Sequence, residues 1–113
     1  MGKPAISSAD WLETVHGSIE EAFENHLNRC RAFLRQKSIS ATGEGISETA
    51  RIVKGFIEEV GGSAELWGSP DYPIVFGRLD AGAPRTLVVY GMYDVQPVEE
   101  SRWSSPPFGA EIR

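Results

Sequence analysis

The sequence has few of the residues that mark extracellular, membrane-spanning or nucleic-acid-binding proteins. Its one cysteine among 113 residues, Cys30, cannot form an internal disulfide, and this fits a reducing, cytoplasmic compartment. No apolar run exceeds a few residues, so we expect neither a transmembrane span nor a signal peptide. Eleven Lys and Arg against sixteen Asp and Glu give a formal charge of −5, so we expect no nucleic acid or membrane partner.

The apolar content of 41% is that of an ordinary globular domain. Asp10 and Glu13 have the spacing of a capping box, and apolar side chains then recur at three- and four-residue steps. This pattern predicts one long helix over residues 10–37, with Gly17 as its weak point and an apolar stripe that packs on a second helix and on the sheet. The stripe consists of Leu12, Val15, Ile19, Ala22, Leu27, Cys30, Phe33 and Leu34.

A second helix is predicted over residues 46–60, with the glycine pair after it as the stop signal. Strands are predicted over residues 64–68, 73–79 and 86–91. The short link between the last two favours an antiparallel pair, and the apolar run in residues 86–91 favours burial on both faces.

The order of helices before strands favours an α/β architecture: two N-terminal helices, then strands of a mixed sheet. We expect a single catalytic-type domain portion over residues 1–113. It would comprise a tail over 1–9, helices over 10–60, strands over 64–91 and a proline-containing loop over 92–113.

Several residues carry only weak signals for chemistry. Gly43-Glu44-Gly45 lacks a third glycine and a Walker lysine, so a flexible connector is favoured over a nucleotide loop. His16 and His26 are ten residues apart on the predicted helix, too far to share a metal, and we expect both at the surface. Cys30 lies on the apolar stripe and is expected to be a buried structural thiol.

The stretch from Leu87 to Val98 is the most informative part of the sequence. A buried strand ends at Gly91 and delivers Asp94 just beyond its end, the edge at which α/β folds bind ligands. On these residues alone, Asp94 is either a site residue or a turn or capping aspartate.

The run Tyr90-Gly91-Met92-Tyr93-Asp94-Val95-Gln96-Pro97-Val98, followed by Trp103-Ser104-Ser105-Pro106-Pro107-Phe108, resembles the amino-terminal signature of the co-catalytic zinc peptidases and deacylases. This group, metallopeptidase family 20, includes aminoacylases, acetylornithine deacetylase, succinyl-diaminopimelate desuccinylase and carnosine-type dipeptidases. The resemblance extends over about residues 9–113. It implies the first part of an α/β catalytic domain that holds two zinc ions.

The family motif His-x-Asp aligns on Met92-Tyr93-Asp94. In the family the histidine ligates zinc and the aspartate orients that histidine, so the resemblance gives Asp94 a supporting catalytic role. Met92 occupies the histidine position, and a thioether is a poor ligand for Zn²⁺. The family's other metal ligands and its general base follow downstream of this motif, so we expect zinc only in a complete domain and no retained metal ligand in this chain.

The resemblance therefore predicts the amino-terminal part of a metal-dependent amide hydrolase acting on N-acyl amino acids or small peptides, and inactive by itself. The alternative is a non-catalytic pseudo-hydrolase module for binding or interaction, in which Met92 marks the lost metal site. We expect association with a complementary carboxy-terminal polypeptide or self-association, because Trp103 and Phe108 would otherwise leave apolar surface exposed.

Overall fold

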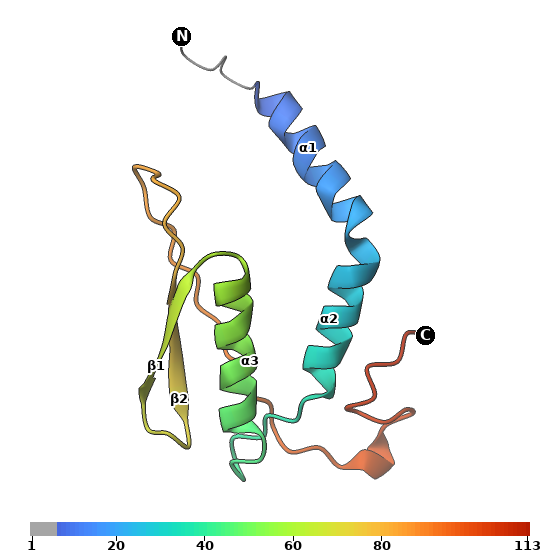
Figure 1. The fold of residues 1–113 in the computed structure, drawn as a ribbon. Helices are drawn as coiled ribbons and strands as arrows, with labels where there is room; N and C mark the ends of the chain where they lie inside the picture. Colours follow the sequence, from blue (N-terminus) through green and yellow to red (C-terminus); the bar gives the residue numbers. More distant parts are fainter. Residues whose placement is uncertain (1–6) are drawn as a thin grey trace.

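The computed structural model describes residues 7–113. Three α-helices precede a two-stranded antiparallel sheet, and a long irregular segment with one short 3-10 helix follows (Figure 1). The elements are α1 (Ser8–Glu21), α2 (Phe23–Arg35), α3 (Ile46–Glu59), β1 (Ser63–Gly68), β2 (Pro73–Arg78) and η1 (Glu100–Arg102). The α/β character is confirmed, whereas the predicted mixed sheet is wrong for the described residues, whose sheet is purely antiparallel.

The first helical pattern forms two helices, α1 and α2, where one was predicted. They meet at Ala22, whose φ of −95° and ψ of 5° leave the helical range, whereas Gly17 lies inside α1. The helix also begins earlier than Asp10: the Ser7 hydroxyl accepts a hydrogen bond of 3.2 Å from the Asp10 amide, so the cap is Ser7. The predicted tail over residues 1–9 thus ends by Ser7, and residues 1–6 lie outside the described part.

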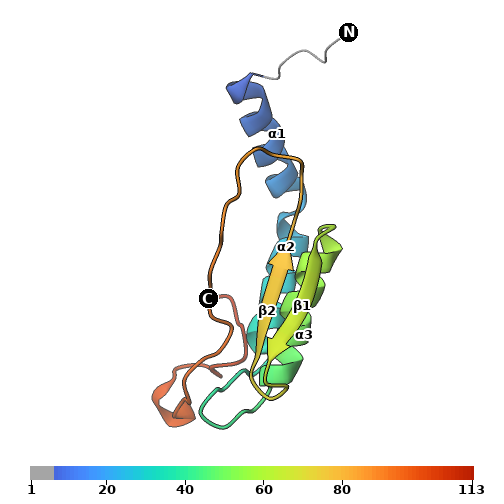
Figure 2. The ribbon, with the colours of Figure 1, turned by 90° about the vertical axis from the view of Figure 1, so that its left-hand side faces the viewer.

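The predictions for α3 and the first two strands are confirmed. The left-handed Gly61 ends α3 (φ 85°), and its amide donates to the Glu58 carbonyl at 2.9 Å. The hairpin pairs β1 with β2 in the register Ser63↔Arg78 to Gly68↔Pro73. Helix α3 lies along one face of this hairpin (Figure 2), where a Cβ at Gly77 would come within 2.5 Å of the Ile57 side chain.

The prediction that residues 86–91 form a strand beside residues 73–79 is wrong for this structure. The ladder partner of β2 is β1, and within residues 7–113 no backbone hydrogen bond reaches residues 86–91. The predicted burial on both faces is also wrong: Leu87, Val88, Val89 and Tyr90 are each 84–86% exposed. A strand forms only where a neighbouring backbone satisfies its amides and carbonyls, and the described residues offer no such neighbour here.

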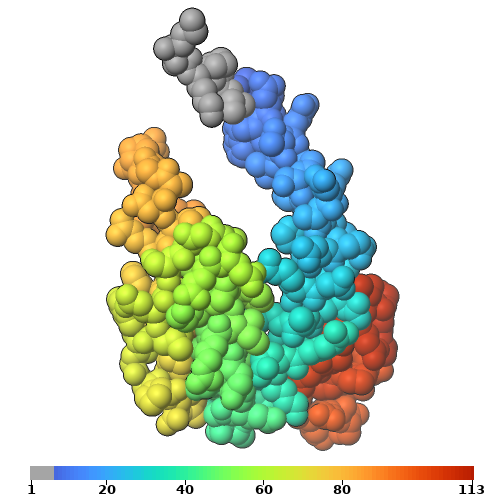
Figure 3. Space-filling model, in the orientation of Figure 1, coloured from blue at the N-terminus to red at the C-terminus, as the bar shows by residue number. Residues whose placement is uncertain are grey.

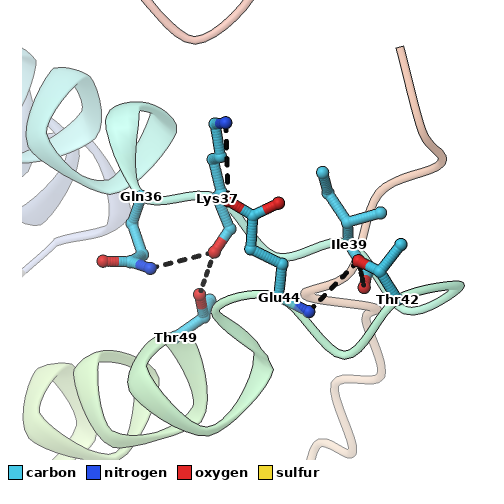
Figure 4. A network of polar contacts seen from close by, with 6 residues as sticks. All are labelled: Gln36, Lys37, Ile39, Thr42, Glu44 and Thr49. Carbon is cyan, nitrogen blue, oxygen red and sulfur yellow. Dashed lines mark hydrogen bonds and ion pairs between the residues drawn. The ribbon is translucent and has the colours of Figure 1, made fainter.

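The core is formed by loop residues that precede the predicted connector Gly43-Glu44-Gly45 and by the first turns of α3 that follow it. Its buried residues are Ser38, Ile39, Ile46, Thr49 and Ala50. Polar contacts order this loop (Figure 4): the Lys37 carbonyl accepts hydrogen bonds from the side chains of Gln36, at 2.9 Å, and Thr49, at 3.3 Å. The Ile39 amide also donates to the Glu44 carbonyl at 2.8 Å. Backbone and side-chain hydrogen bonds therefore hold the loop between α2 and α3 in one conformation, although its small residues are typical of a flexible linker.

The apolar stripe of the first two helices packs only at its carboxy-terminal end. Phe33 of α2 meets Phe56 of α3 with ring centroids 5.8 Å apart, and the guanidinium of Arg29 lies 5.0 Å over the same Phe56 ring. On α1 the side chains at Leu12, Val15 and Ile19 are all exposed. The expectation that the whole stripe packs on the second helix and the sheet is therefore wrong for α1.

The molecule is far more open than a self-contained domain of its size. Its radius of gyration is 18.1 Å, whereas about 13 Å is typical of a compact chain of this length. Its accessible surface is 9355 Å², about half as much again as the roughly 6,100 Å² expected for a folded monomer of this mass. Helix α1 and the turn before residue 86 project from the body as two separate arms (Figure 3).

A substitution at Gly45 tests whether the loop between α2 and α3 is ordered. Gly45 has φ 73°, and a Cβ there would lie 1.8 Å from the Lys37 carbonyl oxygen. Gly45→Ala should lower the free energy of unfolding by more than the roughly 1–2 kcal/mol of left-handed strain alone, because the overlap adds to it. Denaturant unfolding measures the change.

The matched control is Gly55→Ala in the middle of α3, where nothing lies within 4 Å of the added Cβ. It should raise the free energy of unfolding by about 0.5–1 kcal/mol, since alanine is the better helix former. Equal effects of the two substitutions would contradict the ordered geometry of the loop.

Candidate functional site: the Met92–Asp94 motif

The motif is tied to the core at two points. The Val95 amide donates a hydrogen bond of 2.7 Å to the Ser38 carbonyl, which makes a parallel bridge between Ile39 and Val95. Two residues earlier, the Tyr93 hydroxyl donates to the carbonyl of Pro73, the first residue of β2. Residues 93–95 are therefore positioned by the ordered loop and by the hairpin together.

The phenol of Tyr93 lies in a less polar setting than water. Partial burial raises the pKa of Tyr93, and the neighbouring Asp94 carboxylate raises it further by disfavouring a second negative charge. The phenol therefore stays protonated and remains a hydrogen-bond donor to Pro73.

Met92 and Asp94 are among the residues that line a large apolar cavity of about 830 Å³. One wall of this cavity is β2, the opposite wall is formed by residues from Leu87 onward, and α3 contributes apolar side chains such as Val53 and Ile57. Arg78 and Asp94 are the only charged residues that line it. Such a lining suits apolar polypeptide better than a metal ion.

The residues at the motif do not fit a zinc ion. Met92 is 78% exposed, and its thioether is a soft, neutral group where the family has an imidazole. Across residues 7–113 no group of three or more His, Cys, Asp or Glu side chains is arranged to hold a metal. Asp94 is half-buried beside Tyr93 and has no histidine to orient.

The weaker candidates lie away from this motif. His16 on α1 and His26 on α2 are both exposed, in agreement with the surface positions predicted for them. Cys30 is exposed as well, so the prediction of a buried thiol is wrong: it lies on the solvent side of α2, whereas Arg29 and Phe33 meet α3. Gly43-Glu44-Gly45 shapes the ordered loop.

Comparison with solved structures identifies the fold. The chain matches the M20 family metallo-carboxypeptidase Sso-CP2 from Sulfolobus solfataricus with a TM-score of 0.68 and 44% sequence identity. The chain is related to the M20 metallopeptidases. The match covers 74% of this chain and 20% of that enzyme, so the chain spans about a fifth of the length of its M20 relative. No family model matches the sequence, and no curated protein does so significantly.

The M20 relationship confirms the resemblance stated from the motif. Two hydrogen bonds that position the motif were not predicted from the sequence. The Tyr93 hydroxyl donates to the Pro73 carbonyl, and the Val95 amide donates to the Ser38 carbonyl. The one sequence signal for the Val95 contact was Ile39, an isolated apolar residue among small and polar ones, because such a residue marks a buried position.

Among residues 7–113 no helix is both long enough and apolar enough to cross a membrane.

The raised pKa of Tyr93 gives a pH dependence of stability with a defined sign. The folded state holds the phenol proton more tightly than the unfolded state, whose tyrosines titrate near pH 10. The contribution of the protonated Tyr93 phenol to the free energy of unfolding is complete below about pH 10. It is lost as the pH rises through the higher pKa of the folded state.

Tyr93→Phe should therefore reduce the loss of stability as the pH rises above about 10, measured by denaturant midpoints at each pH. Tyr90→Phe is the matched control, because Tyr90 is exposed on the unpaired segment, and it should leave the profile unchanged. Equal pH profiles for the two variants would show that the Tyr93 phenol makes no special contribution to stability.

Proposed function

We propose that this chain contributes the amino-terminal framework of the catalytic domain of a metal-dependent hydrolase that cleaves amide bonds, and that it holds no metal by itself. In this function the chain supplies the scaffold behind the motif, and the metal ligands and general base come from the remainder of the domain. The substrate class is that of the family: N-acyl amino acids or small peptides.

The observation that carries the proposal is the placement of Met92-Tyr93-Asp94. The motif follows an extended apolar segment, and two hydrogen bonds hold it against the core although the ligand position is a methionine. Retention of Asp94, together with the 44% identity to a metallo-carboxypeptidase, supports descent from a working hydrolase.

A second candidate function is a pseudo-hydrolase module that binds a partner without catalysis. The observation that favours it is Met92 itself, because an exposed thioether cannot replace an imidazole on zinc. The two functions differ in whether a histidine at position 92 restores metal binding and hydrolysis.

The test is to co-express the chain with the carboxy-terminal remainder of the metallo-carboxypeptidase that it resembles. Zinc per complex is measured after dialysis, and hydrolysis is measured on N-acyl amino acids and short peptides. Met92→His should add one zinc per complex and raise hydrolysis at least tenfold, since a zinc-bound water is a nucleophile near neutral pH. Met92→Leu, which has similar volume and no imidazole, should leave both at the wild-type level.

Asp94→Asn in the Met92→His background should weaken zinc binding about 10–100-fold, as loss of a carboxylate behind a ligating histidine does. The isolated wild-type chain should retain no stoichiometric zinc. One tightly held zinc per isolated chain would contradict the proposal. A complex that assembles but gains neither zinc nor hydrolysis with Met92→His would favour the binding module.

A further inference from the structure

We propose that the groove between the first turns of α3 and the turn that joins β1 to β2 binds a small monocarboxylic acid with an apolar body. The guanidinium of Arg51 pairs with the carboxylate, and apolar side chains of the groove pack against the rest of the ligand. The proposal goes beyond the proposed function, because binding in this groove requires neither a metal nor hydrolysis.

The groove is formed by two neighbouring segments of the chain. The β1–β2 turn lies beside the amino-terminal end of α3 (Figure 1 and Figure 2). The Ser47 hydroxyl on α3 donates a hydrogen bond of 2.7 Å to the Pro70 carbonyl, which holds the turn against the helix. All residues that line the groove fall within residues 47–51 of α3 and residues 66–73 of the hairpin. The groove therefore depends only on how α3 packs on its own hairpin.

The groove contains one unmatched positive charge. Arg51 is the only charged residue that lines it, and no carboxylate of residues 7–113 forms an ion pair with Arg51. An arginine stays charged, and the planar fork of its N–H donors matches the two oxygens of a carboxylate. One cation without a partner therefore favours one monoanion as the ligand.

Ser69 supplies a second donor from the turn. Its oxygen accepts a hydrogen bond of 3.3 Å from the Asp71 amide, so its hydroxyl hydrogen remains available to a ligand. The hydroxyl of Ser47 offers only lone pairs, because its hydrogen is donated to Pro70. Arg51 and Ser69 line the same groove, so both can donate to one carboxylate, and hydrogen bonds to an ionised acceptor are the stronger ones.

The remaining walls and the size of the groove define the body of the ligand. Leu66, Pro70 and Pro73 supply an apolar lining, and Pro73 is buried. The groove has a volume of about 240 Å³, the space of about eight waters at roughly 30 Å³ each. A branched aliphatic acid such as isovalerate, with about seven non-hydrogen atoms, matches this space.

The groove is a separate space from the cavity beside the Met92–Asp94 motif. Arg51 and Ser69 line only the groove, and Pro73 is the one residue that lines both spaces. The carbonyl of Pro73 also accepts the hydrogen bond from the Tyr93 hydroxyl. A bound acid therefore lies against the residue that holds the motif and leaves the motif itself unoccupied.

The test is an NMR titration of the chain with sodium isovalerate at constant ionic strength, followed through backbone amide resonances. The amides of Arg51, Gly68 and Ser69 should shift and saturate with a dissociation constant of about 1–10 mM, as expected for so small a ligand. Isovaleramide has nearly the same shape and no charge. It should bind at least tenfold more weakly, because it cannot form the ion pair.

Arg51→Gln removes the charge at an exposed helix position that suits glutamine, and it should weaken isovalerate binding at least tenfold. Ser69→Ala removes one neutral donor and should weaken binding about 2- to 10-fold. The matched control is Arg85→Gln. Arg85 is also exposed and has no ion pair within residues 7–113, but it lies in the turn before residue 86, so this variant should bind like the wild type.

Three outcomes would overturn the proposal. They are the absence of a saturable shift at the groove by about 50 mM isovalerate, equal binding of isovaleramide, and a loss of binding in Arg51→Gln no greater than that in Arg85→Gln. Unchanged amide resonances away from the groove verify that each variant is folded. The titration uses no zinc and measures no hydrolysis, so its failure is distinguishable from failure of the proposed function.

Discussion

The structure depends on the requirement that backbone amides and carbonyls of a strand be paired and that an apolar strand be covered on both faces. β1 and β2 meet this requirement in part, because they pair with each other and α3 covers one face. Residues 86–91 meet neither part of it. Four consecutive apolar side chains in water and a free backbone edge are what soluble proteins avoid, so this segment is the least self-sufficient part of the described chain.

A small buried core, called the hub here, supports residues 86–91 and the motif that follows them. The hub consists of Ser38, Ile39, Ile46, Thr49 and Ala50. The left-handed Gly45 lets α3 begin directly against the Lys37 carbonyl. Val95 joins this hub through its amide, so the end of the family motif is bound to the best-packed part of the chain although the strand before it is free. The motif is therefore held by the core and by β2 although residues 86–91 themselves are unpaired.

Local signals were sufficient to predict the elements whose partners are close in sequence. The boundaries of α3 and of the two paired strands follow from helical periodicity, the glycine pair after α3 and β-branched residues, since each element packs on its sequence neighbour. The register of the hairpin came only from the structure. Helix 10–37 was predicted as continuous because the interruption at Ala22 has no glycine or proline to mark it.

The site was predicted less completely, for a physical reason. Met92 and Asp94 were identified by the motif, whereas their positioning depends on contacts to Pro73 and Ser38 that are 20 or more residues away. Burial of residues 86–91 was inferred from their apolar character. That inference describes the environment the segment needs, which residues 7–113 do not supply.

The central claim is that the chain folds as an open framework whose apolar strand awaits cover. Small-angle X-ray scattering of the isolated monomer, with binding of a hydrophobic dye measured on the same sample, tests it most directly. An open framework should have a radius of gyration near 18.1 Å and bind the dye strongly. A compact monomer near the roughly 13 Å of a self-contained domain, with no dye bound, would contradict it.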